Sequence, residues 1–223
     1  MIDFVKARRM MVDGQIRTND VTDLRVIAAM LEVPRERFVL ADKQALAYLD
    51  LDIPVLGAAG RNPRCLLKPM VQAKLVQAAD VGEHDHILDV ACATGYSSAI
   101  LSRLGQSVIA LEEDGGLART AKMALAEVGA ANVTVTTGPL TDGCAAHAPY
   151  DVILVNGDSE VVPHNLLAQL KDGGRLVIVL GHGPIGKATV FSRSRSGHVG
   201  AHPVFDAVAP LLPGFAKPAE FVF

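Results

Sequence analysis

The stretch His86-Ile-Leu-Asp-Val-Ala-Cys-Ala-Thr-Gly-Tyr96 decides the fold of this chain. It opens with a short apolar run that contains β-branched side chains, which is typical of a buried strand. Ala91, Ala93 and Gly95 then place small residues at alternate positions, and residues 97–104 read as a helix. A strand that passes through small residues into a helix predicts a loop where a ligand can approach the backbone and the helix N-terminus.

The alternation of strand and helix continues downstream. Four more apolar runs predict strands at residues 107–112, 132–137, 151–156 and 175–180. Helical segments separate them, at residues 117–128 and in a stretch with Pro163 near its start and Gly173-Gly174 after its end. This order predicts an α/β fold: a Rossmann-like, doubly wound, mostly parallel sheet covered on both faces. After Leu180 only strand and turn patterns remain, so we expect a C-terminal strand hairpin at one sheet edge.

Residues 1–80 have a different, helical texture. Leu24, Ile27, Ala28 and Leu31 recur at the spacing of one helix face, and Pro34 follows as a stop signal. Pro69 occupies a place typical of a first helical turn. We therefore expect a helical arm or lid over residues 1–80, packed on a Rossmann-like domain at residues 81–223.

Composition excludes several classes of protein. Of 223 residues, 50% are hydrophobic and 20% charged, which is typical of a folded globular chain. The 21 Lys and Arg against 24 Asp and Glu, with 4% aromatic residues, argue against nucleic-acid binding. No apolar stretch reaches the ~18 residues that a membrane span needs. The three cysteines and seven histidines show no disulfide or metal-ligand spacing, so we expect no metal and a cytoplasmic protein with reduced thiols.

Two known nucleotide-binding motifs, the phosphate-binding loop and the dinucleotide-binding loop, do not match this sequence. Gly181-His-Gly-Pro-Ile-Gly-Lys-Ala188 resembles a phosphate-binding loop but lacks its final Ser or Thr, so we interpret it as a hairpin turn. The dinucleotide pattern G-x-G-x-x-G would put its third glycine at Tyr96. The spacing fits a G-x-G-x-G loop better, the form used by methyltransferases that bind S-adenosylmethionine. Glu112 ends the next strand, where a carboxylate is expected to bind a pair of ribose hydroxyls.

Five segments carry a likeness to a known family. They are Met11-Val-Asp-Gly-Gln-Ile-Arg17, Val33-Pro-Arg-Glu-Arg-Phe-Val39, Leu88-Asp-Val-Ala-Cys-Ala-Thr-Gly-Tyr96, Ala148-Pro-Tyr-Asp-Val-Ile-Leu154 and Leu170-Lys-Asp-Gly-Gly-Arg-Leu-Val177. In these the chain resembles the protein-L-isoaspartate O-methyltransferase family. The resemblance implies a methyltransferase that uses S-adenosylmethionine to methylate the free carboxylate of L-isoaspartyl residues in damaged proteins or peptides.

The resemblance also implies which residues meet the cofactor. Glu112 would hold the ribose, Asp89 and the loop from Ala91 to Gly95 would meet the amino-acid end, and Leu140 would line the adenine. The full set of implied cofactor-binding residues is Leu66, Leu67, Asp89, Ala91, Cys92, Ala93, Gly95, Glu112, Glu113 and Leu140.

The chain departs from the family at functional positions. Where the family has two of its three loop glycines, this chain has Ala91 and Ala93. Where the family has Asp-Gly after the third strand, this chain has Gly138-Pro139-Leu140. Leu67 stands where the family has a serine tied to catalysis, so no catalytic residue is assigned. A carboxylate substrate is already ionised at neutral pH, with a reference pKa of ~4, so methyl transfer can proceed by positioning alone.

Two alternatives to isoaspartate repair stay open. The alanines and the missing Asp favour a degenerate homologue that binds a nucleoside or a protein partner without catalysis. Leu67 together with the acids Asp158 and Glu160 favours a methyltransferase for a different substrate. The sequence does not rank these alternatives, and it does not indicate an oligomeric state.

Overall fold

The structure is a computed structural model of the chain and describes residues 2–56, 64–181 and 185–218. The strands are β1 (Ile53–Leu56), β2 (Arg64–Leu66), β3 (His86–Val90), β4 (Ser107–Glu112), β5 (Val133–Thr137), β6 (Tyr150–Ser159), β7 (Leu170–Leu180), β8 (Gly186–Arg193) and β9 (Val199–Ala207). The α-helices are α1 (Phe4–Met11), α2 (Leu24–Glu32), α3 (Pro69–Ala78), α4 (Tyr96–Leu101), α5 (Gly115–Glu127) and α6 (His164–Leu167). Shorter helical turns lie at Val12–Ile16, Arg17–Asn19, Arg35–Phe38, Ala41–Leu46, Leu140–Asp142 and Ala145–His147.

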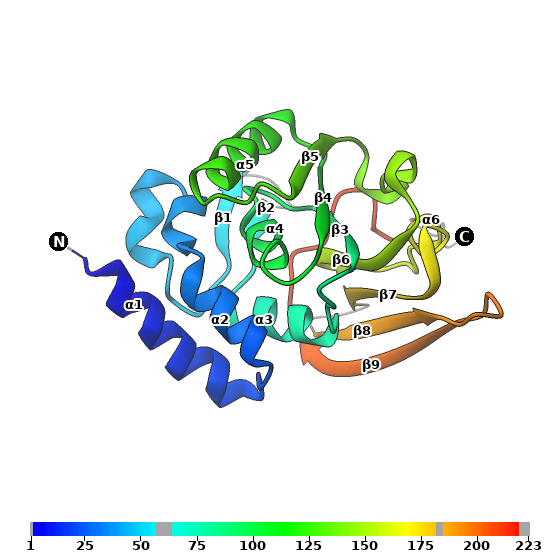
Figure 1. Cartoon of the computed structure of the whole chain (residues 1–223), viewed down its shortest axis with the longest axis horizontal. Helices are drawn as coiled ribbons and strands as arrows, with labels where there is room; N and C mark the ends of the chain where they lie inside the picture. The colour runs from blue at the N-terminus through cyan, green and yellow to red at the C-terminus, as the bar shows by residue number, and fades with distance from the viewer. Residues whose placement is uncertain (1, 57–63, 182–184, 219–223) are drawn as a thin grey trace, which may run out of the picture.

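A seven-stranded sheet with the order β5-β4-β3-β6-β7-β8-β9 is the centre of the molecule (Figure 1). The strands from β5 to β7 pair in parallel, and β8 and β9 follow as an antiparallel hairpin at one edge. This confirms the predicted α/β fold with a mostly parallel sheet and a C-terminal hairpin. Part of the predicted hairpin turn, residues 182–184, lies outside the described residues.

The two faces of the sheet are covered differently. Strand residues that alternate along the chain, such as Ile87 and Leu88, belong to two separate apolar clusters, one on each face. The N-terminal arm and the helices α3, α4 and α5 contribute to the first cluster. The second is closed by α6, the turn at Leu140–Asp142 and the C-terminal side chains Leu212 and Phe215. Both faces are therefore buried, as a doubly wound sheet requires.

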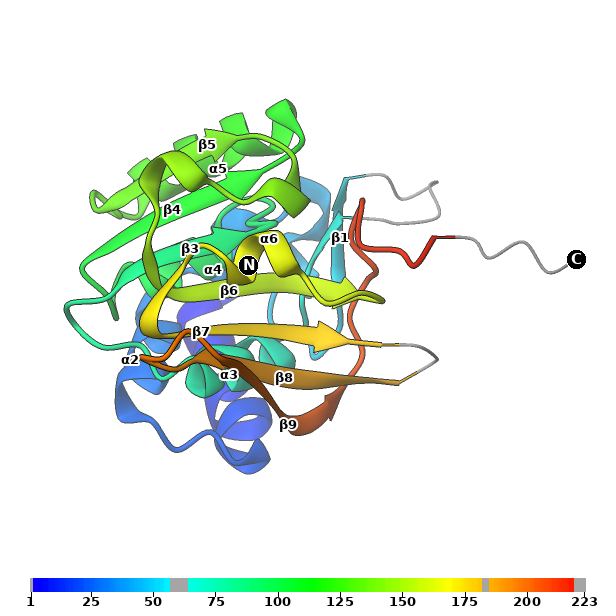
Figure 2. The same cartoon turned by 90° about the vertical axis from the view of Figure 1, so that its right-hand side faces the viewer.

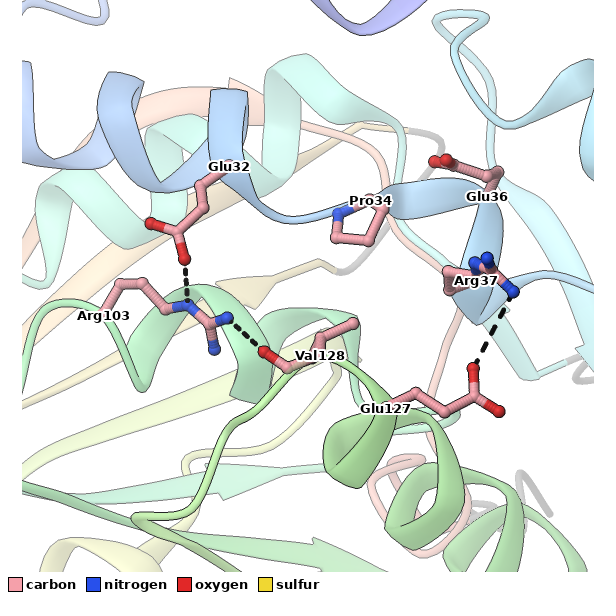
Figure 3. Close-up of a pocket in the computed structure, with 7 residues that line it drawn as sticks. All are labelled: Glu32, Pro34, Glu36, Arg37, Arg103, Glu127 and Val128. Carbon is pink, nitrogen blue, oxygen red and sulfur yellow. Dashed lines mark hydrogen bonds and ion pairs between the residues drawn. The ribbon is translucent and has the colours of Figure 1, made fainter. Parts of the chain in front are cut away.

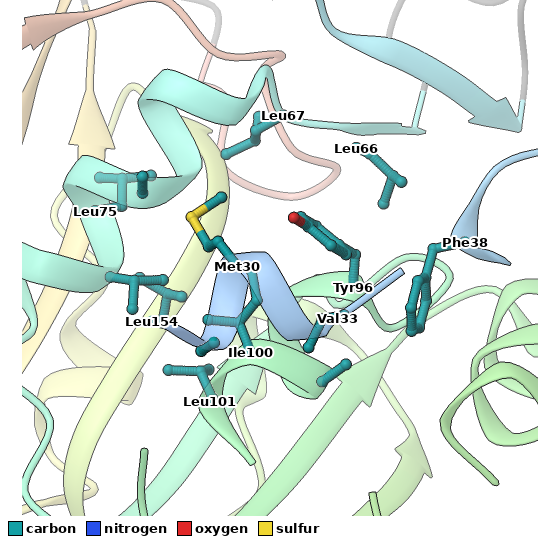
Figure 4. Close-up of a cluster of buried hydrophobic side chains, with 14 of the residues drawn as sticks. Met30, Val33, Phe38, Leu66, Leu67, Leu75, Tyr96, Ile100, Leu101 and Leu154 are labelled. Atoms are coloured by element: carbon teal, nitrogen blue, oxygen red, sulfur yellow. The ribbon is translucent and has the colours of Figure 1, made fainter. Parts of the chain in front are cut away.

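The N-terminal arm shares its core with the parallel sheet. Figure 4 shows apolar side chains from both parts in one cluster. The labelled members are Met30, Val33, Phe38, Leu66, Leu67, Leu75, Tyr96, Ile100, Leu101 and Leu154. Because they come from the arm, the β2 segment, α3, α4 and β6, burying this cluster fixes the arm against the sheet.

Two expectations about local structure are wrong. Residues 1–80 are not purely helical, because β1 and β2 form a separate antiparallel ribbon that the β-branched Ile53 and Val55 favour. The fifth parallel strand does not begin at residue 175, because β7 already begins at Leu170 and contains Gly173-Gly174. A Cβ at Gly174 would lie 2.9 Å from the carbonyl oxygens of Lys171 and Tyr150, so this irregular strand needs glycine there.

The carboxyl ends of β3, β4 and β6 meet at one edge of the sheet. In Figure 2 the arrowheads of β6 and β7 point toward β1 and toward the red C-terminal segment. That segment is held on β6, since the Asp158 N–H donates to the Pro210 carbonyl at 2.8 Å and the Leu212 N–H to the Asp158 carbonyl at 3.0 Å. This edge is where doubly wound sheets bind ligands. In the described part of the chain, no helix has the length and apolar character to cross a membrane.

Candidate functional site

The loop after β3 keeps the backbone of a glycine-rich loop although it contains alanines. Ala91, Ala93 and Gly95 have φ angles of 60°, 53° and 96°, in the left-handed region that favours glycine. For an L-residue with a side chain this conformation costs roughly 1–2 kcal/mol. Gly95 is also needed for packing, because a Cβ there would lie 3.1 Å from the Leu125 side chain on α5.

Glu112 places a fully buried carboxylate beside this loop, at the end of β4. Its Oε2 accepts a hydrogen bond from the Ala93 N–H at 2.8 Å. Its Oε1 accepts from the N–H groups of Glu113 and Asp114 at 3.0 and 3.2 Å. The backbone therefore fixes the carboxylate at the position that the sequence predicts for ribose recognition.

Arg64 of β2 also reaches this carboxylate. Its Nη2 lies 2.6 Å from Glu112 Oε2, and the two side chains are 9% and 1% exposed, so the ion pair is almost free of water. The Arg64 Nε is buried and has no hydrogen-bond partner. Sequence reasoning missed Arg64, although a single arginine at the start of the buried run Arg64-Cys-Leu-Leu67 was a usable signal.

Asp89 is the second buried carboxylate of the site, and three side chains bind it. Its Oδ2 accepts from the hydroxyls of Ser97 and Ser98 at 2.7 and 2.5 Å, and its Oδ1 accepts from Asn156 Nδ2 at 2.7 Å. Burial raises the pKa of Asp89 to about 6, against the opposing effect of these hydrogen bonds. Gln72 of α3 donates to Asn156 Oδ1 at 3.2 Å, so the network joins β3, α4, β6 and α3.

Leu67, at the family's serine position, is 1% exposed and belongs to the apolar cluster between arm and sheet. Arg35, which is fully buried, holds this segment by donating from Nη2 to the Leu67 carbonyl at 2.8 Å. The Arg35 guanidinium also lies over the Tyr96 ring, 4.7 Å from its centroid, and burial lowers the pKa of Arg35. The arm thus fixes the Leu67 backbone, while the leucine side chain supplies no hydroxyl.

Five of the ten predicted site residues line a very small cavity of about 10 Å³. It is lined by Cys65, Leu66, Leu67, Gln72, Ala91, Cys92, Ala93, Ser97 and Asn156. Asp89 and Glu112 contact this group through the hydrogen bonds described above. Sites for small molecules usually measure about 300–1,000 Å³, so the side chains in this conformation fill the space that a nucleoside would need.

Three predicted residues lie away from the small cavity. Gly95 contacts α5 rather than the cavity. Glu113 has an exposed side chain and contributes only its N–H to Glu112. Leu140 is buried in the cluster on the other face of the sheet, with Ala91 and Leu111. Among the described residues, the structure contains no group of His, Cys, Asp and Glu that could hold a metal ion.

A larger cavity of about 570 Å³ lies between the arm and α5 and contains none of the predicted site residues (Figure 3). Ion pairs cross it: Arg103 Nε lies 3.1 Å from Glu32 Oε1, and Arg37 Nη1 lies 4.0 Å from Glu127 Oε2. Because Arg37 and Glu127 are each about 60% exposed, we interpret this hollow as a solvated contact between arm and helix.

A family model and similar sequences point to the same family. Residues 6–207 match the family described as protein-L-isoaspartate(D-aspartate) O-methyltransferase. A protein-L-isoaspartate O-methyltransferase from Methanoregula boonei is 38% identical over 189 residues, which is 85% of each chain. One from Koribacter versatilis is 37% identical over 179 residues, covering 80% of this chain and 78% of the relative.

Solved structures share the fold. A protein-L-isoaspartate O-methyltransferase superposes with a TM-score of 0.80 at 23% identity, over 93% of this chain and 66% of that one. A Plasmodium falciparum protein described as a putative protein-L-isoaspartate O-methyltransferase, in complex with S-adenosyl-L-homocysteine, gives a TM-score of 0.78 at 15% identity. That match covers 92% of this chain and 97% of the other.

Proposed function

The chain belongs to the protein-L-isoaspartate O-methyltransferase family, and we propose that it methylates the free carboxylate of L-isoaspartyl residues in proteins with S-adenosylmethionine. One observation in the structure supports this most directly. Glu112 at the end of β4 is held by three backbone N–H groups beside a loop with left-handed φ angles at positions 91, 93 and 95. A fixed carboxylate next to such a loop is suited to a ribose diol.

The polar groups of the site fit this cofactor, whereas the cavity is too small for it in the present conformation. Glu112 would accept hydrogen bonds from the ribose hydroxyls, and the loop with Asp89 would face the amino-acid end. Leu66, Leu67 and Cys92 would exclude water around the reacting groups, whereas Leu140, buried on the other face of the sheet, is not placed to line the adenine in this conformation. S-adenosylmethionine supplies a methyl group on a sulfonium ion. The cavity of about 10 Å³ is filled by the chain's own side chains, so these must move before a nucleoside enters.

The substrate carboxylate needs no base in this proposal. It is an anion at neutral pH, with a reference pKa of ~4. The residues of the chain therefore have to position it and keep water out. We propose that the arm, residues 1–80, serves this purpose as a lid. Its Phe38 carbonyl accepts a hydrogen bond from the Thr94 hydroxyl at 2.5 Å, which connects the arm to the loop after β3.

A second candidate function is a homologue that binds a partner without catalysis. The specific observation in its favour is that Arg64 and the apolar side chains of residues 65–67 close the cofactor site, while the family's serine is replaced by Leu67. Calorimetric titration with S-adenosylmethionine and S-adenosylhomocysteine separates the two. Binding of either supports the methyltransferase. No binding at millimolar ligand contradicts it and favours the second candidate.

Methyl transfer itself is tested with a radiolabelled donor and two peptides that differ only in containing isoaspartyl or ordinary aspartyl. Transfer confined to the isoaspartyl peptide supports the proposed substrate. Transfer to neither peptide, by a protein that binds the cofactor, would point to a different substrate.

We also propose that the protein works in the reducing cytoplasm. The described residues include all three cysteines and contain no disulfide bond. Alkylation of the unfolded chain without reductant should attach three labels, because a reducing compartment keeps thiols reduced. Fewer labels on freshly isolated protein would contradict this assignment.

A further inference from the structure

The ion pair between Arg64 and Glu112 uses the last acceptor position of the carboxylate. A carboxylate offers about four acceptor positions, two on each oxygen. Oε1 accepts from Glu113 and Asp114, and Oε2 accepts from Ala93 and from Arg64 at 2.6 Å. The three backbone donors belong to the framework of β4 and the loop and cannot leave. Only Arg64 can release a position to a ligand hydroxyl.

Arg64 is also the less firmly held partner. Its Nε is buried without a hydrogen-bond partner, whereas both oxygens of Glu112 are fully used. A buried donor without a partner raises the free energy of this arrangement. Glu112 would keep three charge-assisted hydrogen bonds after Arg64 had moved, so the carboxylate stays compensated and in place.

From this geometry we infer that Arg64 is an internal competitor of the cofactor and sets its affinity. The inference rests on the proposed function. In the closed conformation the guanidinium occupies the binding position of the ribose hydroxyls, and the cofactor binds only after Arg64 has released Glu112. The observed association constant is then the intrinsic association constant of the open form multiplied by the fraction of molecules that are open. Arg64 also determines specificity. A ligand that has no hydroxyl to take the place of the guanidinium on Glu112 cannot compensate the loss of the ion pair, so it binds the open site weakly.

The test is calorimetric titration of the full chain with S-adenosylhomocysteine. We compare the wild type with Arg64→Ala and Arg64→Met, of which the second keeps an unbranched apolar side chain but donates no hydrogen bond. Arg25→Gln is the matched control, because Arg25 is a half-exposed arginine paired with Asp23 in the arm. Both Arg64 variants should bind at least tenfold more tightly than the wild type, and Arg25→Gln should bind like the wild type.

Chemical rescue distinguishes competition from a structural effect. Millimolar ethylguanidinium, added to Arg64→Ala, should weaken S-adenosylhomocysteine binding back toward the wild-type value, whereas the same concentration of tetramethylammonium should not. A merely structural role of Arg64 predicts no difference between the two cations.

The outcomes separate this inference from the proposed function. Wild-type affinity in both Arg64 variants would overturn the inference and leave the proposed function standing. No binding by any of the proteins would overturn both. Failure of both variants to fold, judged by circular dichroism, would also overturn the inference, because a residue that must move aside cannot be required for the fold.

Discussion

At the scale of single residues, the loop after β3 holds two alanines in a backbone conformation that favours glycine. Ala91 and Ala93 keep the left-handed φ angles of 60° and 53° that glycine would adopt freely. Because the surrounding strand and helix determine this conformation, the alanine methyl groups are tolerated as local strain. Ala91 and Ala93 both line the small cavity, and Ala91 also belongs to the apolar cluster that contains Leu140.

The double variant Ala91→Gly/Ala93→Gly should be more stable than the wild type. Relief of left-handed strain of roughly 1–2 kcal/mol per residue is partly offset by the entropy that glycine loses on folding, ~0.5–1 kcal/mol each. We expect a net gain of about 1 kcal/mol in the free energy of unfolding, measured by urea denaturation. We also expect tighter binding of S-adenosylhomocysteine.

Ala126→Gly is the control for this prediction, because Ala126 is exposed in helix α5 and has no left-handed strain. It should lose about 1 kcal/mol. An equal loss in the double variant would show that the loop has already adapted to alanine.

Glu112→Gln should weaken S-adenosylhomocysteine binding by about 1–3 kcal/mol, the usual effect of losing a hydrogen bond to a charged group. An amide keeps the shape of the carboxylate but offers one acceptor oxygen instead of two. The control is Glu127→Gln on α5, a largely exposed side chain 4.0 Å from Arg37, which should bind like the wild type. Equal affinity of the two variants in calorimetry would remove Glu112 from the binding site.

At the scale of secondary-structure elements, the buried network around Asp89 connects four of them and brings a titratable group into the core. Asp89 is the next-to-last residue of β3, Ser97 and Ser98 lie at the start of α4, Asn156 lies on β6 and Gln72 on α3. The pKa of Asp89 is raised from 3.8 to about 6 by burial. The folded protein therefore binds this proton more tightly than the unfolded chain does.

This raised pKa predicts that Asp89 reduces the stability of the protein as the pH rises. The stabilisation that this bound proton contributes is fully present below about pH 4. It is lost between about pH 4 and pH 6, where the unfolded chain has already released the proton that the folded protein still holds, and the loss is about 3 kcal/mol in total. In Asp89→Asn this decline should be absent. The check is the difference in unfolding free energy between wild type and variant, measured from pH 4 to pH 7.

The exposed Asp13→Asn variant serves as the control for the pH series, since its side chain is 60% exposed. It should follow the wild type at every pH. A wild-type curve parallel to that of Asp89→Asn would mean that the carboxyl is not buried as described.

The secondary-structure elements differ in how well the sequence predicts them. Four of the five parallel strands were predicted to within three residues at each end, because runs such as Val108 to Leu111 are buried on both faces and therefore continuously apolar. The fifth, β7, begins five residues before its predicted start, because Gly173-Gly174 interrupts its apolar pattern. The β1–β2 ribbon was missed, since a strand of three residues carries too little pattern. Arg64 was missed as part of the site because its contact with Glu112 spans 48 positions and depends on the tertiary fold.

At the scale of the whole molecule, the arm and the sheet behave as one packed unit. Leu67 joins the two parts, because it belongs to the shared cluster and also lines the small cavity of the candidate site. Arg35 of the arm fixes the backbone at this position through the Leu67 carbonyl. Leu67 is therefore firmly held, and a substitution there is expected to change the packing of the arm as well as any role of this position in methyl transfer.

We predict that the wild type transfers methyl groups to an isoaspartyl peptide slowly and that Leu67→Ser is faster, by up to about 10²-fold. A misplacement of the substrate by ~1 Å can cost that much in rate, and a serine hydroxyl can orient the substrate carboxylate where leucine cannot. The substitution removes a buried leucine, so the variant should also lose about 2–5 kcal/mol of stability. The assay therefore has to run well below the midpoint of its thermal unfolding.

Leu75→Ser is the matched control, because Leu75 is a fully buried leucine of α3 in the same cluster. It should lose similar stability without any gain in transfer to the peptide. A rise in rate confined to Leu67→Ser would identify substrate positioning as the missing function. If the wild type already turns over rapidly, the serine is dispensable in this chain and the prediction is wrong. If neither the wild type nor Leu67→Ser transfers a methyl group although both bind the cofactor, the isoaspartyl carboxylate is not the substrate of this site.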